Sequence, residues 1–172
     1  MARTPLQREL RQKRPFRSPA QEALLSLVRT TDCLGRTLAH VIEPQGITRQ
    51  QFNVLRILRG ALPEPLPTLE IGERMVEQTP GITRLLDRLE AKGLVARKRC
   101  RDDRRQVHCR VTQAGLDLLA QLDQPVLDAE EVMMGVIGRA GQRQLVALLD
   151  RLRAAQPPAS RHARDRGEPV RG

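Results

Sequence analysis

Apolar residues recur at steps of three and four over long stretches of the chain, and this spacing is typical of amphipathic helices. The first stretch, 19–42, ends where Pro44 breaks the pattern. A second long helix is predicted to begin after Thr112, an N-cap residue, and to end near Gly138. The last helix is predicted over about 142–154. Each of these helices carries an apolar stripe that needs a partner to cover it.

Shorter helices are predicted in the middle of the chain. One begins at a capping box, in which Thr48 is the N-cap residue and Gln51 lies three positions later, and it runs to Arg59. The alternating prolines of 62–67 exclude a helix there and predict an exposed, stiff connector. A short helix is then predicted over 68–76. Its inward-facing residues are predicted to be Leu69, Ile71 and Met75.

The next helix has well-marked ends, and after it the period of the pattern changes. Thr79 is placed as its N-cap residue, Pro80 as its first helical residue and Gly93 just past its end. Two short strands are predicted over 94–101 and 106–111, joined by a tip of four residues. The helix residues predicted to pack inward are Ile82, Leu85, Leu86 and Leu89.

Two short helices joined by a tight turn and followed by a β-hairpin form a winged helix-turn-helix. The predicted fold class is therefore mainly α with a small β-hairpin wing, flanked by N- and C-terminal helices. We expect one domain over 18–155, with a compact lobe at about 46–111. The flanking helices are expected at about 19–43 and 116–155.

The formal net charge of +10 is unevenly distributed. The segment 84–110 holds ten basic and four acidic side chains, while the rest of the central chain is slightly acidic. One strongly basic segment on such a scaffold indicates a polyanion-binding surface. A merely solvated charged surface is the alternative. The terminal segments 1–17 and 156–172 are also basic and poor in apolar residues, so we predict that both are disordered tails.

The predicted helix after Thr79 and the hairpin that follows place polar and cationic groups together. The major groove of DNA admits one α-helix, whose first turn must expose polar groups while its apolar face is packed from behind. Arginine near the tip of a hairpin suits a narrow minor groove, where negative potential is concentrated. The candidate DNA-binding residues of the helix are Thr79, Pro80, Gly81, Thr83, Arg84 and Arg88. Those of the hairpin are Arg97, Lys98, Arg99, Arg101, Asp103, Arg104 and Arg105.

Four runs of sequence in this order, 70–75, 81–95, 103–107 and 111–115, resemble the multiple-antibiotic-resistance regulator (MarR) family. The resemblance extends over roughly 19–155 with the flanking helices. It implies a homodimer whose first and last helices intertwine, a recognition helix in the major groove and a wing in the minor groove.

Particular residues carry this resemblance. The Asp-x-Arg motif of the family's wing falls on Asp103 and Arg105, with Asp102 and Arg104 as an alternative register. The Thr-Arg pair of the recognition helix falls on Thr83 and Arg84. Many family members bind phenolic ligands between the dimer core and the DNA-binding lobe. With two Phe and no Trp or Tyr, this chain has little to stack against an aromatic ring.

The apolar stripes of the first and last helices lie outside what the compact lobe can cover. They either pair two chains about a two-fold axis or pack on each other within one chain. Two paired chains would set their reading helices about 34 Å apart, which predicts a near-palindromic operator of roughly 16–22 base pairs. The residues predicted to form the dimer are Leu24, Leu27, Leu34, Leu145, Leu148, Leu149 and Leu152.

The cysteines and histidines do not indicate a further site. Cys33 lies in the middle of a helix beside its apolar stripe, so we expect a packed thiol. His108 and Cys109 are neighbours on a strand and point to opposite faces, which argues against a shared metal ion. Cys100 and Cys109 lie on opposing strands, so their oxidation is a hypothesis. We expect no metal and no cofactor.

The predicted function is a homodimeric transcriptional regulator that binds double-stranded DNA at specific sequences. We expect a repressor released by a ligand or by stress, with a small-molecule effector that the sequence does not identify. The alternative is a winged-helix module that docks a protein. Three scattered serines and three histidines offer no nucleophile–base pair, so we predict no enzyme. No apolar run is long enough for a membrane span or a secretory signal, so we expect a cytoplasmic protein.

Overall fold

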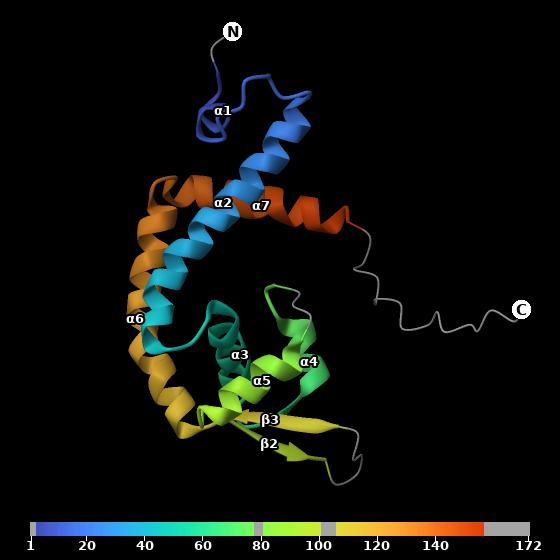
Figure 1. Ribbon diagram of the computed structural model, residues 1–172, viewed down its shortest axis with the longest axis vertical. Coiled ribbons are helices and arrows are strands. Elements are labelled where there is room, and N and C mark those ends of the chain that lie inside the picture. Colours follow the sequence, from blue (N-terminus) through green and yellow to red (C-terminus); the bar gives the residue numbers. More distant parts are fainter. Residues whose placement is uncertain (1–2, 78–80, 101–105, 157–172) are drawn as a thin grey trace, which may run out of the picture. The chain divides into compact units, whose positions relative to one another are not determined.

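The computed structural model describes residues 3–77, 81–100 and 106–156, which belong to two compact units divided after Glu130. The elements of the first unit are α1 (Pro5–Glu9), α2 (Pro19–Ile42), the 3-10 helix η1 (Glu43–Gln45), α3 (Arg49–Gly60), β1 (Leu66–Pro67), α4 (Thr68–Arg74), α5 (Ile82–Ala91), β2 (Val95–Arg99), β3 (Val107–Val111) and most of α6 (Gln113–Gly135) (Figure 1). The second unit contains the end of α6 and α7 (Gly138–Ala154). The predicted fold class, mainly helical with a small antiparallel sheet, is confirmed.

An aliphatic core holds the first unit together, as a chain with 1% aromatic residues requires. It lies where α3, α4 and α5 pack against one another and against the sheet, and α6 adds two leucines to it. The largest fully buried side chains include Leu55, Leu58, Ile71, Leu86, Leu89, Leu119 and Leu122. Among the described helices, none has an apolar stretch that could cross a bilayer.

The sheet contains a strand that the sequence did not predict. The strand order is β1-β3-β2, with both pairs antiparallel, and Cys109 of β3 lies between Leu66 of β1 and Arg97 of β2. The prediction of an exposed connector over 62–67 was therefore wrong at its end, where Leu66 is buried. A proline is tolerated there because β1 is an edge strand, on which one backbone N–H is not needed for pairing.

The start of α6 lies close to the backbone at the base of the hairpin. The Thr112 hydroxyl donates a hydrogen bond to the Gly93 carbonyl at 2.7 Å and accepts one from the Gly115 N–H at 3.2 Å, which confirms Thr112 as the helix cap. A Cβ atom on Gly115 would lie 2.5 Å from the Leu94 carbonyl oxygen and 2.7 Å from Cγ2 of Val111. Glycine is therefore required where α6 crosses the base of the hairpin.

The prediction of disorder throughout 1–17 was wrong, because the described part of this segment includes helix α1. Its N-cap Thr4 and Gln7 form a capping box, with Pro5 in the first turn, and the side chains of Leu6 and Gln7 are buried. These capping residues are a local helix signal that the basic composition of the segment concealed. The predicted tail 156–172 lies almost wholly outside the described residues.

Several predicted boundaries and facings also need correction. The third predicted helix ends at Arg74, and its Leu69 is 75% exposed rather than packed inward. On α6, whose apolar stripe the sequence placed in a core, Leu119 and Leu122 are buried but Leu127 is exposed. The last helix begins at Gly138 rather than at 142, and Gly138 has a positive φ of 61°, which glycine adopts without steric cost.

Candidate nucleic-acid interface

Helix α5 begins later than its sequence signals predicted. Its N-cap is Gly81, whose φ of 99° and ψ of 34° place it in the left-handed region, so the helix starts at Ile82 rather than at Pro80. Among the residues that the structure describes, no side chain caps this end. The predicted contacts Thr79 and Pro80 lie outside the described residues.

The two faces of α5 are clearly separated. Leu85, Leu86 and Leu89 are buried in the core, and Ile82 is half-buried beside them. The opposite face presents side chains that can bond to bases or phosphates. The candidate residues Gly81, Thr83, Arg84 and Arg88 are all exposed. Helix α5 is therefore packed against the core on one face and exposes polar side chains on the other, as a helix that reads a DNA groove must.

The hairpin adds exposed cations next to α5. Lys98 and Arg99 on β2 and Arg110 on β3 are exposed, and β2 packs directly against α5. Arg110 lies opposite Ala96 on the same sheet. The remaining hairpin candidates lie outside the described residues: Arg101, Asp103, Arg104 and Arg105.

Arg97, a predicted DNA contact, instead joins the hairpin to α5. Its guanidinium donates to Glu90 from Nε at 2.8 Å and from Nη2 at 2.5 Å, and Nη2 also lies 2.7 Å from a carboxylate oxygen of Asp87. Only 22% of its side chain is exposed. The hydrogen bond to Glu90 is the main reason that the pKa of Arg97 is raised, so the charge is held in place. Arg97 thus fixes the hairpin to the helix.

The sequence contains a signal for this connection. Asp87 and Glu90 are three residues apart and lie on one face of α5, and Arg97 follows buried Val95 at the two-residue step of a strand. Arg97 therefore belongs to the inward face of β2, whereas Lys98 belongs to the outward face. The number of arginines in the hairpin does not show which face of the strand each one occupies. Arg97 was therefore grouped with the outward-facing cations.

Comparison with known proteins agrees with this geometry. Residues 47–107 match the sequence profile of the MarR family. A MarR transcription factor from Planctomyces limnophilus is 38% identical, with a TM-score of 0.62 over 79% of this chain and 98% of that one. The chain belongs to the MarR family. The resemblance stated from the sequence is thereby confirmed, and this MarR-family chain is a winged-helix transcription regulator.

Two further solved structures are similar to the regulator. A mutant of MarR from E. coli, complexed with operator DNA, is 27% identical over 73% of this chain and 89% of that one, with a TM-score of 0.66. The PcaV transcriptional regulator from Streptomyces coelicolor, in complex with its natural ligand, shares the fold at a TM-score of 0.72. It is 20% identical over 83% of this chain and 99% of that one.

The two described residues that follow Met75 are held from the N-terminal half of α3. The Arg49 guanidinium pairs with Glu77 at 2.9 Å, and the Val76 N–H donates to Oδ1 of Asn53 at 2.9 Å. A cavity of about 270 Å³ opens beside these contacts. Its lining combines Leu38, Ile42, Phe52 and Met75 with Arg49, Asn53, Arg56 and Glu77. This cavity could not be located from the sequence, because its lining comes from four separated segments.

The cysteines differ from expectation. Cys33 is exposed on α2 rather than packed. Cys109 is fully buried, and burial is the main cause that raises the pKa of its thiol. The register places Cys109 opposite Arg97, three residues from Cys100, or about 10 Å along the strand. That separation is too great for a disulfide, so the hypothesis that Cys100 and Cys109 oxidise together is withdrawn.

The Arg97 contacts predict separable effects of two neighbouring substitutions. Arg97→Ala should lower the free energy of unfolding by about 1 kcal/mol, because Asp87 and Glu90 lose a shared partner at a partly exposed site. Lys98→Ala should change it by less than about 0.5 kcal/mol. Chemical denaturation measures both. Equal stability of the two variants would contradict the structural role of Arg97 and return it to the candidate DNA contacts.

Proposed function

We propose that this regulator is a homodimeric repressor that binds a near-palindromic DNA operator, with α5 in the major groove and the hairpin at the adjacent minor groove. The observation that carries the proposal is the division of α5. Thr83 and Arg84 face solvent near its N-terminal end, while three leucines hold its other face in the core. The E. coli MarR complex with operator DNA supports this use of the fold.

Exposed apolar residues support the dimer. On α2, Leu24 is 61% exposed and Leu27 is 37% exposed, and on α7 Leu148 and Leu152 are each more than half exposed. Leu34 and Leu149 are partly buried, and Leu145 is 37% exposed. Apolar helix faces of this kind are covered in stable proteins, and in a two-fold dimer one surface covers its own copy.

A small-molecule effector has a candidate site in the cavity beside α3. Its floor is apolar, and its polar lining combines Arg49 and Arg56 with Glu77 and Glu130, so a small, largely apolar organic molecule with a hydrogen-bond acceptor for Arg49 suits it. Such a ligand would compete with Glu77 for Arg49 and weaken the attachment of the segment after α4 to helix α3. The reading helices of the dimer would then no longer match successive grooves, which is the proposed route to derepression. PcaV in complex with its natural ligand gives a precedent within the fold.

Selection of bound duplexes from a random pool tests the proposal. We expect the full chain to enrich a near-palindrome with half-sites about one helical turn apart. Arg84→Ala should weaken the selected site by about 1–3 kcal/mol and relax the preference at particular positions, because a base contact is lost. Lys98→Ala should weaken all duplexes alike and reduce the salt slope by about 1.

The alternative, a winged helix that docks a protein, makes the opposite prediction. It would enrich no sequence in the same selection. Equal losses on every duplex from Arg84→Ala and Lys98→Ala would also count against sequence reading by α5.

A further inference from the structure

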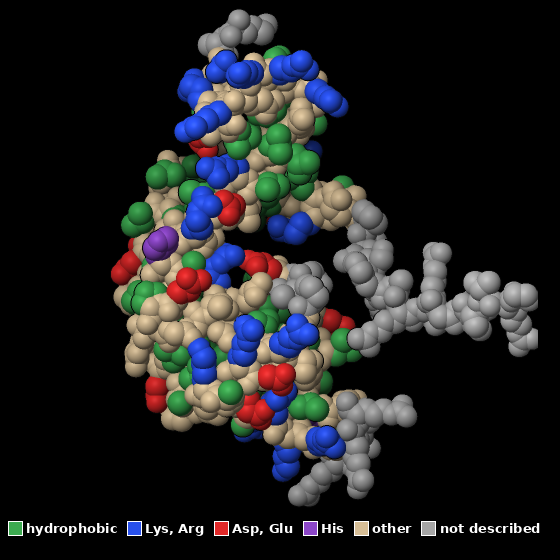
Figure 2. Space-filling model, viewed as in Figure 1, with side chains coloured by type: hydrophobic (Ala, Val, Ile, Leu, Met, Phe, Trp, Pro, Cys, Tyr) green, Lys and Arg blue, Asp and Glu red, His purple; other side chains and the backbone are tan. Residues whose placement is uncertain are grey.

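The segment before α2 forms a basic surface that the proposed function does not use. We call residues 3–17 the basic arm. Its six cations are all exposed: Arg3, Arg8, Arg11, Lys13, Arg14 and Arg17. Figure 2 shows Lys and Arg side chains gathered around the end of the first unit that carries α1. This concentration of one sign of charge is the footprint of a polyanion site.

The basic arm is folded rather than loose. Besides the capping box of α1, the side-chain amide of Gln7 donates to the Arg14 carbonyl at 3.3 Å, and that of Gln12 donates to the same carbonyl at 3.0 Å. Leu6 of the same segment is buried, at 8% exposure. The cations are therefore displayed from an ordered segment, so binding does not have to order it first.

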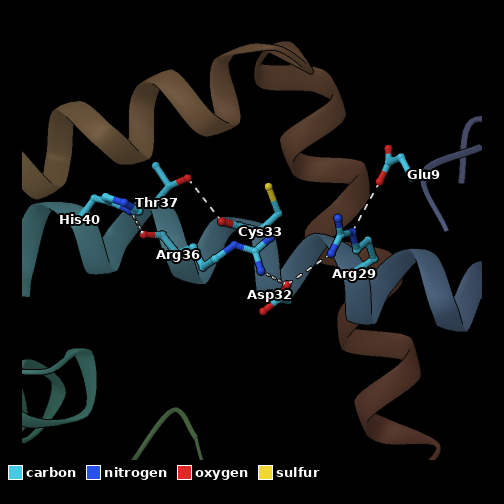
Figure 3. A network of polar contacts seen from close by, with 7 residues as sticks. All are labelled: Glu9, Arg29, Asp32, Cys33, Arg36, Thr37 and His40. Atoms are coloured by element: carbon cyan, nitrogen blue, oxygen red, sulfur yellow. Dashed lines mark hydrogen bonds and ion pairs between the residues drawn. The ribbon is translucent and has the colours of Figure 1, made fainter.

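The one acidic residue of the basic arm does not oppose its cations. Glu9 turns to Arg29 on α2, at 3.6 Å, and Arg29 in turn lies 3.7 Å from Asp32, which also pairs with Arg36 (Figure 3). The charge of Glu9 is thus directed towards α2. In the described part of the arm, the side chains of Lys13, Arg14 and Arg17 take part in no hydrogen bond or ion pair.

The basic arm also lies away from the DNA-reading lobe of its own chain. Helix α2 enters the core through Leu38, Val41 and Ile42, whereas Glu9 meets the helix at Arg29. From Arg29 to Ile42 the helix rises by about 20 Å at 1.5 Å per residue. The arm's cations and the exposed face of α5 are therefore separate surfaces of the first unit.

We infer that the basic arm binds the phosphate backbone of a second DNA duplex while α5 and the hairpin hold the operator, so that the regulator bridges two DNA segments. This inference rests on the proposed function. Five of the six cations are arginines, whose planar guanidinium matches phosphate oxygens with two hydrogen bonds. Duplex DNA is the polyanion that the other surface already selects. No base reading is required, because backbone contacts are independent of sequence.

Capture of a second duplex tests the inference. Immobilised operator is saturated with the 172-residue chain and washed, and the retained protein is quantified. A fluorescent duplex without an operator is then added. The wild type should retain it, and Lys13→Gln/Arg14→Gln/Arg17→Gln should retain at least fivefold less. The salt slope of capture should fall by about 2–3, since each lost phosphate contact contributes about 0.9.

A triple variant of equal charge change provides the control. Arg139→Gln/Arg143→Gln/Arg151→Gln alters exposed cations of α7 and should capture the second duplex as the wild type does, provided that both variants sediment like the wild type. The arm variant should keep the wild-type affinity for the operator.

Three outcomes overturn the inference: no capture by operator-bound wild type, an equal loss in the control variant, or a matching loss of operator affinity in the arm variant. Cosedimentation with phosphatidylserine vesicles but not with duplex would also overturn it, in favour of a lipid surface. If the regulator does not stay on the operator in the first step, the proposed function fails instead, and the quantified protein shows this separately.

Discussion

Gly115→Ala is expected to lower the free energy of unfolding by about 3 kcal/mol, because overpacking against backbone cannot relax by a rotamer change. The new Cβ would meet the Leu94 carbonyl oxygen at 2.5 Å, and Val111 blocks the other direction at 2.7 Å. Helix α6 would have to move away from the base of the hairpin. Thermal unfolding should show a Tm lower by about 6–12 °C for a chain of this size.

Gly60→Ala is the matched control, since no atom lies within 4 Å of a Cβ built there. It ends helix α3, where alanine is tolerated, so its stability should stay within about 0.5 kcal/mol of the wild type or rise slightly. If the two variants melt together, the close approach at Gly115 does not constrain the fold.

Leu148→Asp combined with Leu152→Asp is expected to separate the proposed dimer into single chains of 19.4 kDa. Both side chains are more than half exposed on α7, so charge is tolerated in a single chain but not in an apolar interface. Each chain would then hold only one half-site, and operator affinity should fall about 100-fold through the loss of bivalent binding. Sedimentation equilibrium and fluorescence anisotropy measure the two effects.

Leu62→Asp serves as the control, because Leu62 is 41% exposed on the connector after α3 and outside the predicted dimer surface. It should leave the dimer and the operator affinity unchanged. Circular dichroism of the double variant should show that its helices remain. A wild-type protein that sediments as one chain at micromolar concentration, or a double variant that stays dimeric, would contradict the dimer.

Sequence periodicity predicted the long helices because their apolar faces are continuous and their caps are local. Thr48 with Gln51, and Thr112, act in the structure as their positions indicated. The buried face of α5 was predictable for the same reason, since three leucines at helical spacing must be covered. The position at which α5 begins was not predictable in this way. Thr79 and Pro80 indicated an earlier start, whereas the helix begins after Gly81, which has a left-handed backbone.

Features that depend on distant parts of the chain were harder to predict. Strand β1 forms because Leu66 pairs with Cys109 of β3. The two residues are far apart in the sequence, so the pattern of residues around Leu66 does not indicate the pairing. The role of Arg97 depends on carboxylates of another element, and composition alone placed it with the exposed cations. Segments rich in charge can still fold, as α1 shows, when a capping box and one buried leucine act together.

The ion pairs of Arg97 have a consequence for how such a regulator acquires new target genes. Asp87 and Glu90 bind Arg97 and so keep the helix and the hairpin in one orientation. Thr83, Arg84 and Arg88 are exposed on α5 and take no part in these ion pairs. If α5 reads DNA as proposed, mutations at the second group alter the preferred base sequence and leave the docking pose intact. On that proposal the scaffold diversifies its operators one side chain at a time, without redesigning how the two elements meet the duplex.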